Sequence, residues 1–259
     1  MKNIKILSFF VAISIMMFSC SSESSFNDAT SSESGKGGSM ARFAVVGDYL
    51  YTVNNQSMKL FNIAEEAQPY FTNDVQIGFG IETIFPKDTM LYIGSQDGMF
   101  IYSIATPNNP VRISDYWHMT SCDPVIVDST FAYVTLHTND ENEGGGFWCG
   151  NNTNELHIID ISDITYPTLL QTYPMTRPLG LGIDNNKLFL CDDGLKVYDI
   201  SNSPELTLLQ SFDISAIDVI ALGNILLVVG DDGLYQYSYT NDNLEFISKM
   251  EVCNNNYLP

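Results

Sequence analysis

Basic residues are scarce in this chain of 259 residues: 11 lysines and arginines stand against 31 aspartates and glutamates, which gives a formal charge of −20 at pH 7. Such an acidic surface repels nucleic-acid phosphates and anionic lipid headgroups, so we expect no nucleic-acid partner. It also keeps a secreted protein in solution. Histidine is rare too, and His118, His137 and His157 do not have the spacing of metal ligands. We therefore expect no metal site and no cofactor.

Motifs for catalysis and nucleotide binding are missing as well. The sequence has no Gly-x-Ser-x-Gly elbow, no phosphate-binding loop and no Cys-x-x-Cys pair. Gly78-Phe79-Gly80 is interpreted as a turn, because no helix follows it. The Asp-Asp-Gly stretches at 192–194 and 231–233 lack the alternating ligand spacing of a calcium loop, and we expect them to form hairpin turns.

The N-terminus has the proportions of a signal peptide. Two lysines precede an apolar run over residues 6–18, which is too short to span a membrane comfortably. Ser19 directly before Cys20 resembles the lipobox of bacterial lipoproteins, so we predict a lipoprotein signal peptide over 1–19 and lipidation of Cys20. An ordinary secretory signal with a chance cysteine is the alternative. Cleavage removes two lysines and no acids, leaving 9 basic and 31 acidic residues, or −22.

Residues 20–39 are predicted to form a flexible tether. They are rich in serine, glutamate and glycine and contain one aromatic residue, so they cannot bury a core. About 20 such residues reach roughly 25 Å. The serine after Cys20 is typical of outer-membrane sorting. We therefore expect a cell-envelope, outer-membrane lipoprotein that meets the membrane through its lipid anchor, on a side that the sequence leaves open.

One short sequence pattern recurs along the rest of the chain. It is a turn followed by a strand with alternating faces, clearest at residues 193–201, 97–104 and 232–239 and looser at 57–63 and 155–161. Equivalent positions in the five copies are 41, 57, 39 and 39 residues apart; they are Leu60, Ile101, Ile158, Val197 and Gln236. A period near 40 with four strands per unit is typical of a β-propeller.

The predicted fold is all-β, a five-bladed β-propeller over residues 40–259 with four antiparallel strands per blade. Long amphipathic helical stretches are absent, which argues against a βαβ fold, and a two-sheet sandwich is the alternative. Each unit contains all four strands, so no blade needs to be completed by a strand from the other end of the chain. We expect blade five to close the ring by packing against blade one. The expected blades cover approximately 41–79, 80–120, 121–177, 178–215 and 216–253.

Several stretches resemble the LVIVD-repeat family of bacterial surface lipoproteins with a propeller-like fold. They are residues 122–128, 132–136, 156–162, 188–192 and 233–237. The resemblance is specific in units three to five and loose in unit one. It implies architecture and location, but because the family has no settled activity, it leaves function open.

One face of the predicted ring carries a long insertion. The first strand of a blade lies nearest the axis, so the connections between blades and those between second and third strands share one face. We call it the insertion face, because residues 137–153 extend that hairpin in blade three. Cys122 opens the same blade at this face, and envelope cysteines tend to pair, so we predict a Cys122–Cys149 disulfide rather than two separate thiols. Cys191 is expected in the core, and Cys253 has no evident partner.

Candidate binding residues also gather at the insertion face. Five residues occupy the same position at the start of the innermost strands, and three are acidic: Ala41, Glu82, Asp123, Leu179 and Asp218. Glu82, Asp123 and Asp218 either cap turns through backbone N–H groups or form an acidic funnel for a cation, an amine or a sugar. The insertion adds three further candidates, His137, Phe147 and Trp148; the two aromatics either contact a partner or pack within the loop.

These features favour a non-enzymatic, lipid-anchored binding module that captures an envelope protein or a glycan through the insertion face. One alternative is a glycoside hydrolase that uses the axial carboxylates of Glu82, Asp123 and Asp218, since such chemistry needs two carboxyl groups across the scissile bond. The other alternative is a purely structural component of an envelope assembly.

Overall fold

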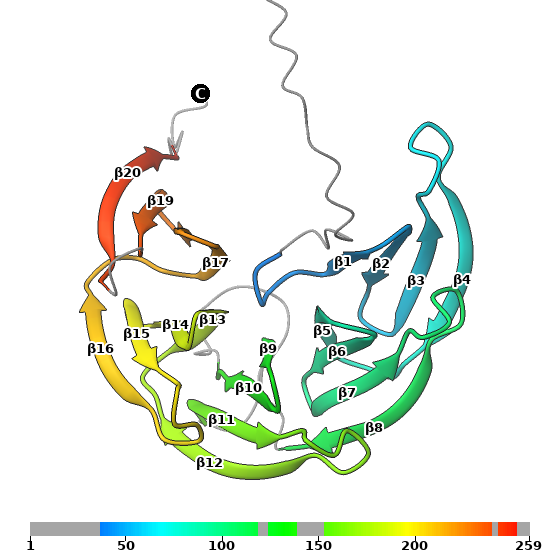
Figure 1. Ribbon diagram of the computed structural model, residues 1–259, viewed down its shortest axis with the longest axis horizontal. Helices are drawn as coiled ribbons and strands as arrows, with labels where there is room; N and C mark the ends of the chain where they lie inside the picture. Colours follow the sequence, from blue (N-terminus) through cyan, green and yellow to red (C-terminus); the bar gives the residue numbers. More distant parts are fainter. Residues whose placement is uncertain (1–36, 119–123, 139–152, 240–242, 253–259) are drawn as a thin grey trace, which may run out of the picture. The chain divides into compact units, whose positions relative to one another are not determined.

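Twenty β-strands, arranged as five four-stranded antiparallel sheets, form the part of the chain that the structure describes (Figure 1). In this computed structural model the described residues are 37–118, 124–138, 153–239 and 243–252, all within one unit that spans residues 33–259. Over these ranges every element is a strand, a bridge, a turn or a bend. The predicted five-bladed β-propeller is confirmed.

Each blade uses four consecutive strands, with the first innermost and the fourth outermost. Blade one contains β1 (Phe43–Val46), β2 (Tyr49–Val53), β3 (Ser57–Asn62) and β4 (Tyr70–Gln76). Blade two contains β5 (Ile81–Lys87), β6 (Met90–Ser95), β7 (Gly98–Ser103) and β8 (Val111–Trp117). Blade three contains β9 (Val125–Asp128), β10 (Phe131–Leu136), β11 (Glu155–Asp160) and β12 (Thr168–Pro174). Blade four contains β13 (Pro178–Asp184), β14 (Lys187–Asp192), β15 (Leu195–Asp199) and β16 (Thr207–Phe212). Blade five contains β17 (Asp218–Leu222), β18 (Ile225–Gly230), β19 (Gly233–Ser238) and β20 (Glu245–Glu251).

The turns between first and second strands explain why asparagine, aspartate and glycine recur there. Gly47, Asp88, Asn185 and Gly223 have φ values of 55°, 53°, 49° and 69°, in the left-handed region. Two-residue hairpins of this kind require φ > 0, which these residue types adopt most readily. The residue types at these steps therefore fit the two-residue hairpins that the structure forms there.

The third and fourth strands of every blade share one irregularity. Their register shifts once in each blade, and always at the equivalent step: Leu60/Phe61, Ile101/Tyr102, Ile158/Ile159, Val197/Tyr198 and Gln236/Tyr237. Such a β-bulge bends the strand and increases its twist. The outermost strand of each blade therefore curves along the perimeter (Figure 1).

Four hydrophobic cores join successive blades. Each lies between the face that a blade turns toward the next one, here called its leading face, and the trailing face of that next blade. Between blades four and five, for example, Leu195 and Val197 share a cluster with Val219 and Leu226, and all four are at most 1% exposed. Cys191 lies in the same cluster, as predicted for a core residue.

The expected packing of blade five on blade one is not found. Successive blades contact each other through their inner strands, whereas β17 and β1 have no comparable contact (Figure 1). No core cluster among the described residues joins blades five and one. Their outward faces keep large apolar side chains exposed, including Phe43 at 57% and Leu222 at 45%. The ring is therefore open between its first and last blades.

Candidate functional site

A cavity of about 370 Å³ lies among the inner strands of blades two to five. That size is within the range of small-molecule sites. Its lining residues come from the last part of each inner strand and the turn after it: Phe85, Pro86, Lys87, Asp88, Ile126, Val127, Asp128, Leu181, Gly182, Ile183, Asp184, Asn185, Val219, Ile220 and Ala221, together with Gly37. The cavity thus lies toward the face opposite the insertion face.

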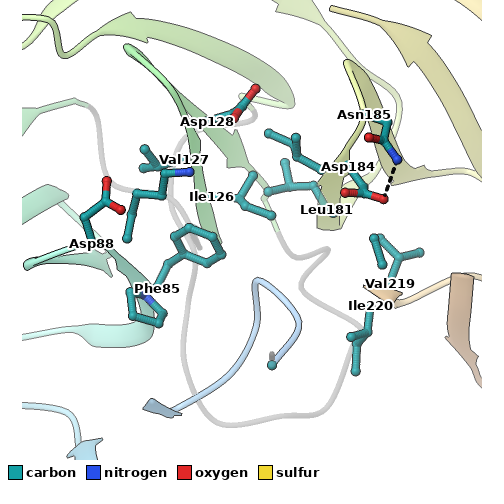
Figure 2. A pocket seen from close by; sticks show the side chains of 16 residues that line it. Phe85, Asp88, Ile126, Val127, Asp128, Leu181, Asp184, Asn185, Val219 and Ile220 are labelled. Atoms are coloured by element: carbon teal, nitrogen blue, oxygen red, sulfur yellow. Dashed lines mark hydrogen bonds between the residues drawn. The ribbon is translucent and has the colours of Figure 1, made fainter. Parts of the chain in front are cut away.

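The cavity has an apolar wall and a charged rim. Figure 2 shows the carboxylates of Asp88, Asp128 and Asp184 on different sides of apolar side chains that include Phe85 and Leu181. With Lys87, the rim carries three acids and one base, a net charge of −2. An apolar enclosure with a few charged groups at its mouth suits a ligand that has a hydrocarbon body and a cationic end.

Hydrogen bonds hold one rim carboxylate in place. Asp184 Oδ2 accepts from Tyr239 Oη at 2.8 Å and from Asn185 Nδ2 at 3.0 Å. Burial, together with the neighbouring Asp184, raises the pKa of Tyr239, so the phenol stays protonated and remains a donor. Asp184 is thereby fixed with its remaining acceptor capacity available to a ligand.

The segment just before blade one is anchored on the axis. Gly38 and Ala41 close a turn through a 3.1 Å backbone hydrogen bond, and Ser39 is fully buried. The N–H of Leu181 donates to Ser39 Oγ at 2.7 Å, and Ser39 Oγ donates to Asp218 Oδ1 at 3.4 Å. The residues placed at the end of the predicted tether therefore dock on blades four and five. We call this turn, residues 38–41, the axial turn.

The carboxylate of Asp218 holds the axial turn in place through hydrogen bonds. It accepts hydrogen bonds from Ser39, from the backbone of Met40 and from the N–H of Val219. A side chain on Gly180 would overlap this carboxylate, which explains why a glycine stands there. Burial raises the pKa of Asp218 from 3.8 to about 6, although these hydrogen bonds oppose the shift.

We expect Asp218→Asn to remove a pH dependence of stability. Between about pH 4 and pH 6 the folded carboxyl keeps a proton that the unfolded chain has already lost. The contribution of this group to stability is therefore largest below about pH 4 and declines as the pH rises through about 6. Urea unfolding of wild type and variant at four pH values measures the difference between the two curves. Parallel curves would contradict the assignment, and Asp48→Asn, at an exposed turn, serves as the control.

The other predicted site residues are distributed as follows. Glu82, in β5, accepts a hydrogen bond from Gln96 Nε2 at 3.2 Å, and neither Glu82 nor Asp218 lines the central cavity. His137 follows β10 and is 6% exposed. The remaining predicted residues lie outside the described part of the chain: Cys20, Cys122, Asp123, Phe147, Trp148 and Cys149.

The described ends of the insertion are tied together. Thr138 Oγ1 donates to the carbonyl of Thr153 at 3.1 Å and accepts from its N–H at 2.9 Å. Nearby, His157 Nε2 lies 2.8 Å from Glu155 Oε2, and its Nδ1 lies 3.1 Å from Tyr116 Oη of blade two. Burial lowers the pKa of His157 despite the neighbouring Glu155. This network connects blades two and three.

A second depression of about 240 Å³ lies on the insertion face between blades four and five. Its lining includes Arg177 and three acids, Asp193, Asp213 and Asp231. Ser215 Oγ donates to Asp231 Oδ2 at 2.9 Å. The carboxylate of Asp231 thus stabilises the segment that connects blades four and five. Within the described ranges, no group of three His, Cys, Asp or Glu side chains could hold a metal ion, and no helix is long and apolar enough to cross a membrane.

The cavity was not foreseen from the sequence. Asp128 and Asp184 are the last residues of β9 and β13, whereas Asp88 follows β5, and each also looks like an ordinary turn residue. The available signal was the recurrence of a carboxylate or amide at the first-to-second-strand turn of blades two, three and four. The first residues of the inner strands were compared instead. That comparison gave Glu82, Asp123 and Asp218, which are expected toward the insertion face, at the opposite end of the axis from the cavity.

Solved structures similar to this chain share the fold at low sequence identity. A protein of unknown function from Desulfotomaculum acetoxidans has a TM-score of 0.63 at 13% identity, covering 84% of this chain and 71% of its own. The Pan2 WD40 domain of Neurospora crassa has a TM-score of 0.57 at 8% identity, covering 83% and 66%. Apo AztD from Citrobacter koseri has a TM-score of 0.55 at 10% identity, covering 77% and 59%. The chain thus spans less than two thirds of the latter two.

The blades, the axial cavity and these likenesses together define a β-propeller protein. No curated protein sequence matches the chain. The LVIVD repeat matches residues 145–175, which contain β11 and β12 of blade three. The predicted resemblance to the LVIVD repeat is thus confirmed for this part of blade three.

Proposed function

We propose that this propeller is a non-enzymatic binding module of the cell envelope, held at the outer membrane through a lipidated Cys20, and that its central cavity takes the cationic end of a ligand. The observation that carries the proposal is the apolar cavity with three carboxylates and one lysine at its rim. Opposite charges attract more strongly where water is partly excluded, so an ammonium or guanidinium group gains there.

The ligand class follows from size and charge. A cavity of about 370 Å³ accommodates a single side chain or a small organic amine rather than a folded domain. A lysine or arginine of an envelope protein would enter with its aliphatic stem against the wall and its charge at the rim. The insertion, with Phe147 and Trp148, is retained as a second contact surface for a protein or glycan partner on the other face.

We expect phenethylamine and N-acetyl-lysine amide to bind, and the corresponding alcohol and carboxylate to bind at least tenfold more weakly. Asp184→Asn and Asp128→Asn should each weaken amine binding about tenfold, which corresponds to about 1.4 kcal/mol. Isothermal titration calorimetry measures both effects. Asp48→Asn is the matched control, because Asp48 occupies the equivalent turn of blade one but does not line the cavity. Equal binding of amine and alcohol would refute a cationic site.

A hydrolase is less well supported. Asp218 accepts hydrogen bonds from the axial turn, and Glu82 accepts one from Gln96, so both carboxylates serve the fold. A general acid and a nucleophile need open access to a shared substrate.

A further inference from the structure

The two ends of the open ring present uncovered apolar faces. The leading face of blade five carries a row of aliphatic side chains: Ile220, Leu222, Ile225, Leu227, Val229 and Leu234. Leu222 and Val229 are 45% and 38% exposed. The trailing face of blade one carries Phe43, Val45, Leu50 and Phe61, and Phe43 is 57% exposed. Large contiguous apolar patches of this kind mark interaction sites.

The four internal interfaces show what such faces accept. In each of them a leading face packs on the trailing face of the following blade. Leu60, Ile101, Ile158 and Val197 occupy one equivalent position on the leading faces of blades one to four, and all are 0% exposed. The ends of the ring are one leading face and one trailing face, the two halves of an interface that the molecule already makes four times.

Among the described residues, no core cluster covers either of these two faces. Residues 20–36 include seven serines and one aromatic residue, and residues 253–259 contain three asparagines in a row. Such segments bury little apolar surface. The axial turn ties blade one to Asp218 only at the axis, which leaves the flanks of both blades uncovered.

We propose that the leading face of blade five binds the trailing face of blade one in a second copy of this chain, head to tail. The contact repeats the internal blade-to-blade interface between molecules. It is heterologous, because two different patches meet, so it either closes into a small ring or continues as an open chain. The terminal faces are mainly apolar, but each mature copy carries 9 basic and 31 acidic residues, a formal charge of −22, so screening by salt strengthens the association.

Sedimentation velocity of the mature chain, starting at residue 20 and carrying Cys20→Ser, tests the proposal. We expect a reversible increase in mass with protein concentration, favoured at 0.5 M over 0.05 M salt. A monomer under every condition would overturn the proposal.

Two variants separate the two faces. Phe43→Asp disables blade one and Leu222→Asp disables blade five, and both sites are exposed enough to keep the fold, which circular dichroism verifies. Each variant alone should associate at least tenfold more weakly, since a charge would be buried in an apolar contact. Mixed together they should form a 1:1 heterodimer and nothing larger, because one intact leading face and one intact trailing face remain.

The controls are exposed aromatic residues away from the terminal faces. Phe79 and Tyr166 are each 76% exposed, and Phe79→Asp and Tyr166→Asp should leave association unchanged. If the mixed variants stay monomeric, or if only one of the two substitutions weakens self-association, the head-to-tail contact is wrong. Phe43 and Leu222 do not line the central cavity, so the outcome is independent of ligand binding there.

Discussion

Leu195→Ala should lower the free energy of unfolding by about 2–5 kcal/mol, whereas Leu234→Ala should lower it by about 1 kcal/mol or less. The two leucines end the same tetrapeptide, Asp-Asp-Gly-Leu, at residues 192–195 and 231–234. Both point from the third strand toward the position of a following blade. Leu195 is fully buried against blade five, while Leu234 is partly exposed because no described blade packs on the leading face of blade five.

The comparison measures whether the ring is open in solution. Urea unfolding at protein concentrations below self-association gives the two free energies without a contribution from a second copy. A ring that closes on itself would bury both leucines alike, so equal losses for the two variants would refute the open arrangement.

Gly98→Ala should be the second strongly destabilising change, at about 3 kcal/mol. Gly98 begins β7 beside the outer strand β8, and a Cβ there would overlap the carbonyl oxygen of Tyr116. A carbonyl in a strand ladder cannot rotate away as a side chain can, so the two strands must separate. Gly194 and Gly233 meet the carbonyl oxygens of Phe212 and Met250 in the same way.

Gly223→Ala is the matched control. Gly223 has a φ of 69°, and a Cβ there would meet open space. Its substitution should cost about 1 kcal/mol, through backbone conformation alone. Thermal and urea unfolding of both variants give the difference. If Gly98→Ala lowers the free energy of unfolding no more than Gly223→Ala does, β8 can move away from the added methyl group at little cost, and the prediction is wrong.

The sequence predicted the blades because their determinants are local. Alternating side chains, Asp-Gly turns and a period near 40 residues each act within one unit, so five copies reinforce one another. The recurring glycine was interpreted as a turn residue. The structure adds that Gly98 must also be small, because two strands pass close to each other there.

The curvature of the ring could not be predicted in the same way. The angle between blades depends on how side chains of different units fill each interface, and no single repeat encodes it. One signal was present: Gln236 stands where blades one to four place Leu60, Ile101, Ile158 and Val197. Its side chain accepts a hydrogen bond from Ser248 Oγ at 2.8 Å, and a polar residue is compatible with this face because no described blade packs on it.

The axial turn was missed because residues 20–39 were assigned to a flexible tether from their average composition, which does not show what a single residue contacts. Serine and glycine predict flexibility, yet Gly38 leaves room for the carboxylate of Asp218, and the Ser39 hydroxyl both accepts and donates a hydrogen bond. The predicted acidic position therefore includes a residue that binds the chain's own backbone.

The five bulges have a consequence for the rim of the molecule. Each outermost strand is a sheet edge with unpaired backbone groups, and several expose apolar pairs such as Leu169-Leu170, Leu208-Leu209 and Phe246-Ile247. A flat edge of this composition would template strand addition and lead to aggregation. The bulge at the same step of every blade bends the edge away from that geometry. This protection matters most at high protein concentration, where edges of neighbouring molecules meet often.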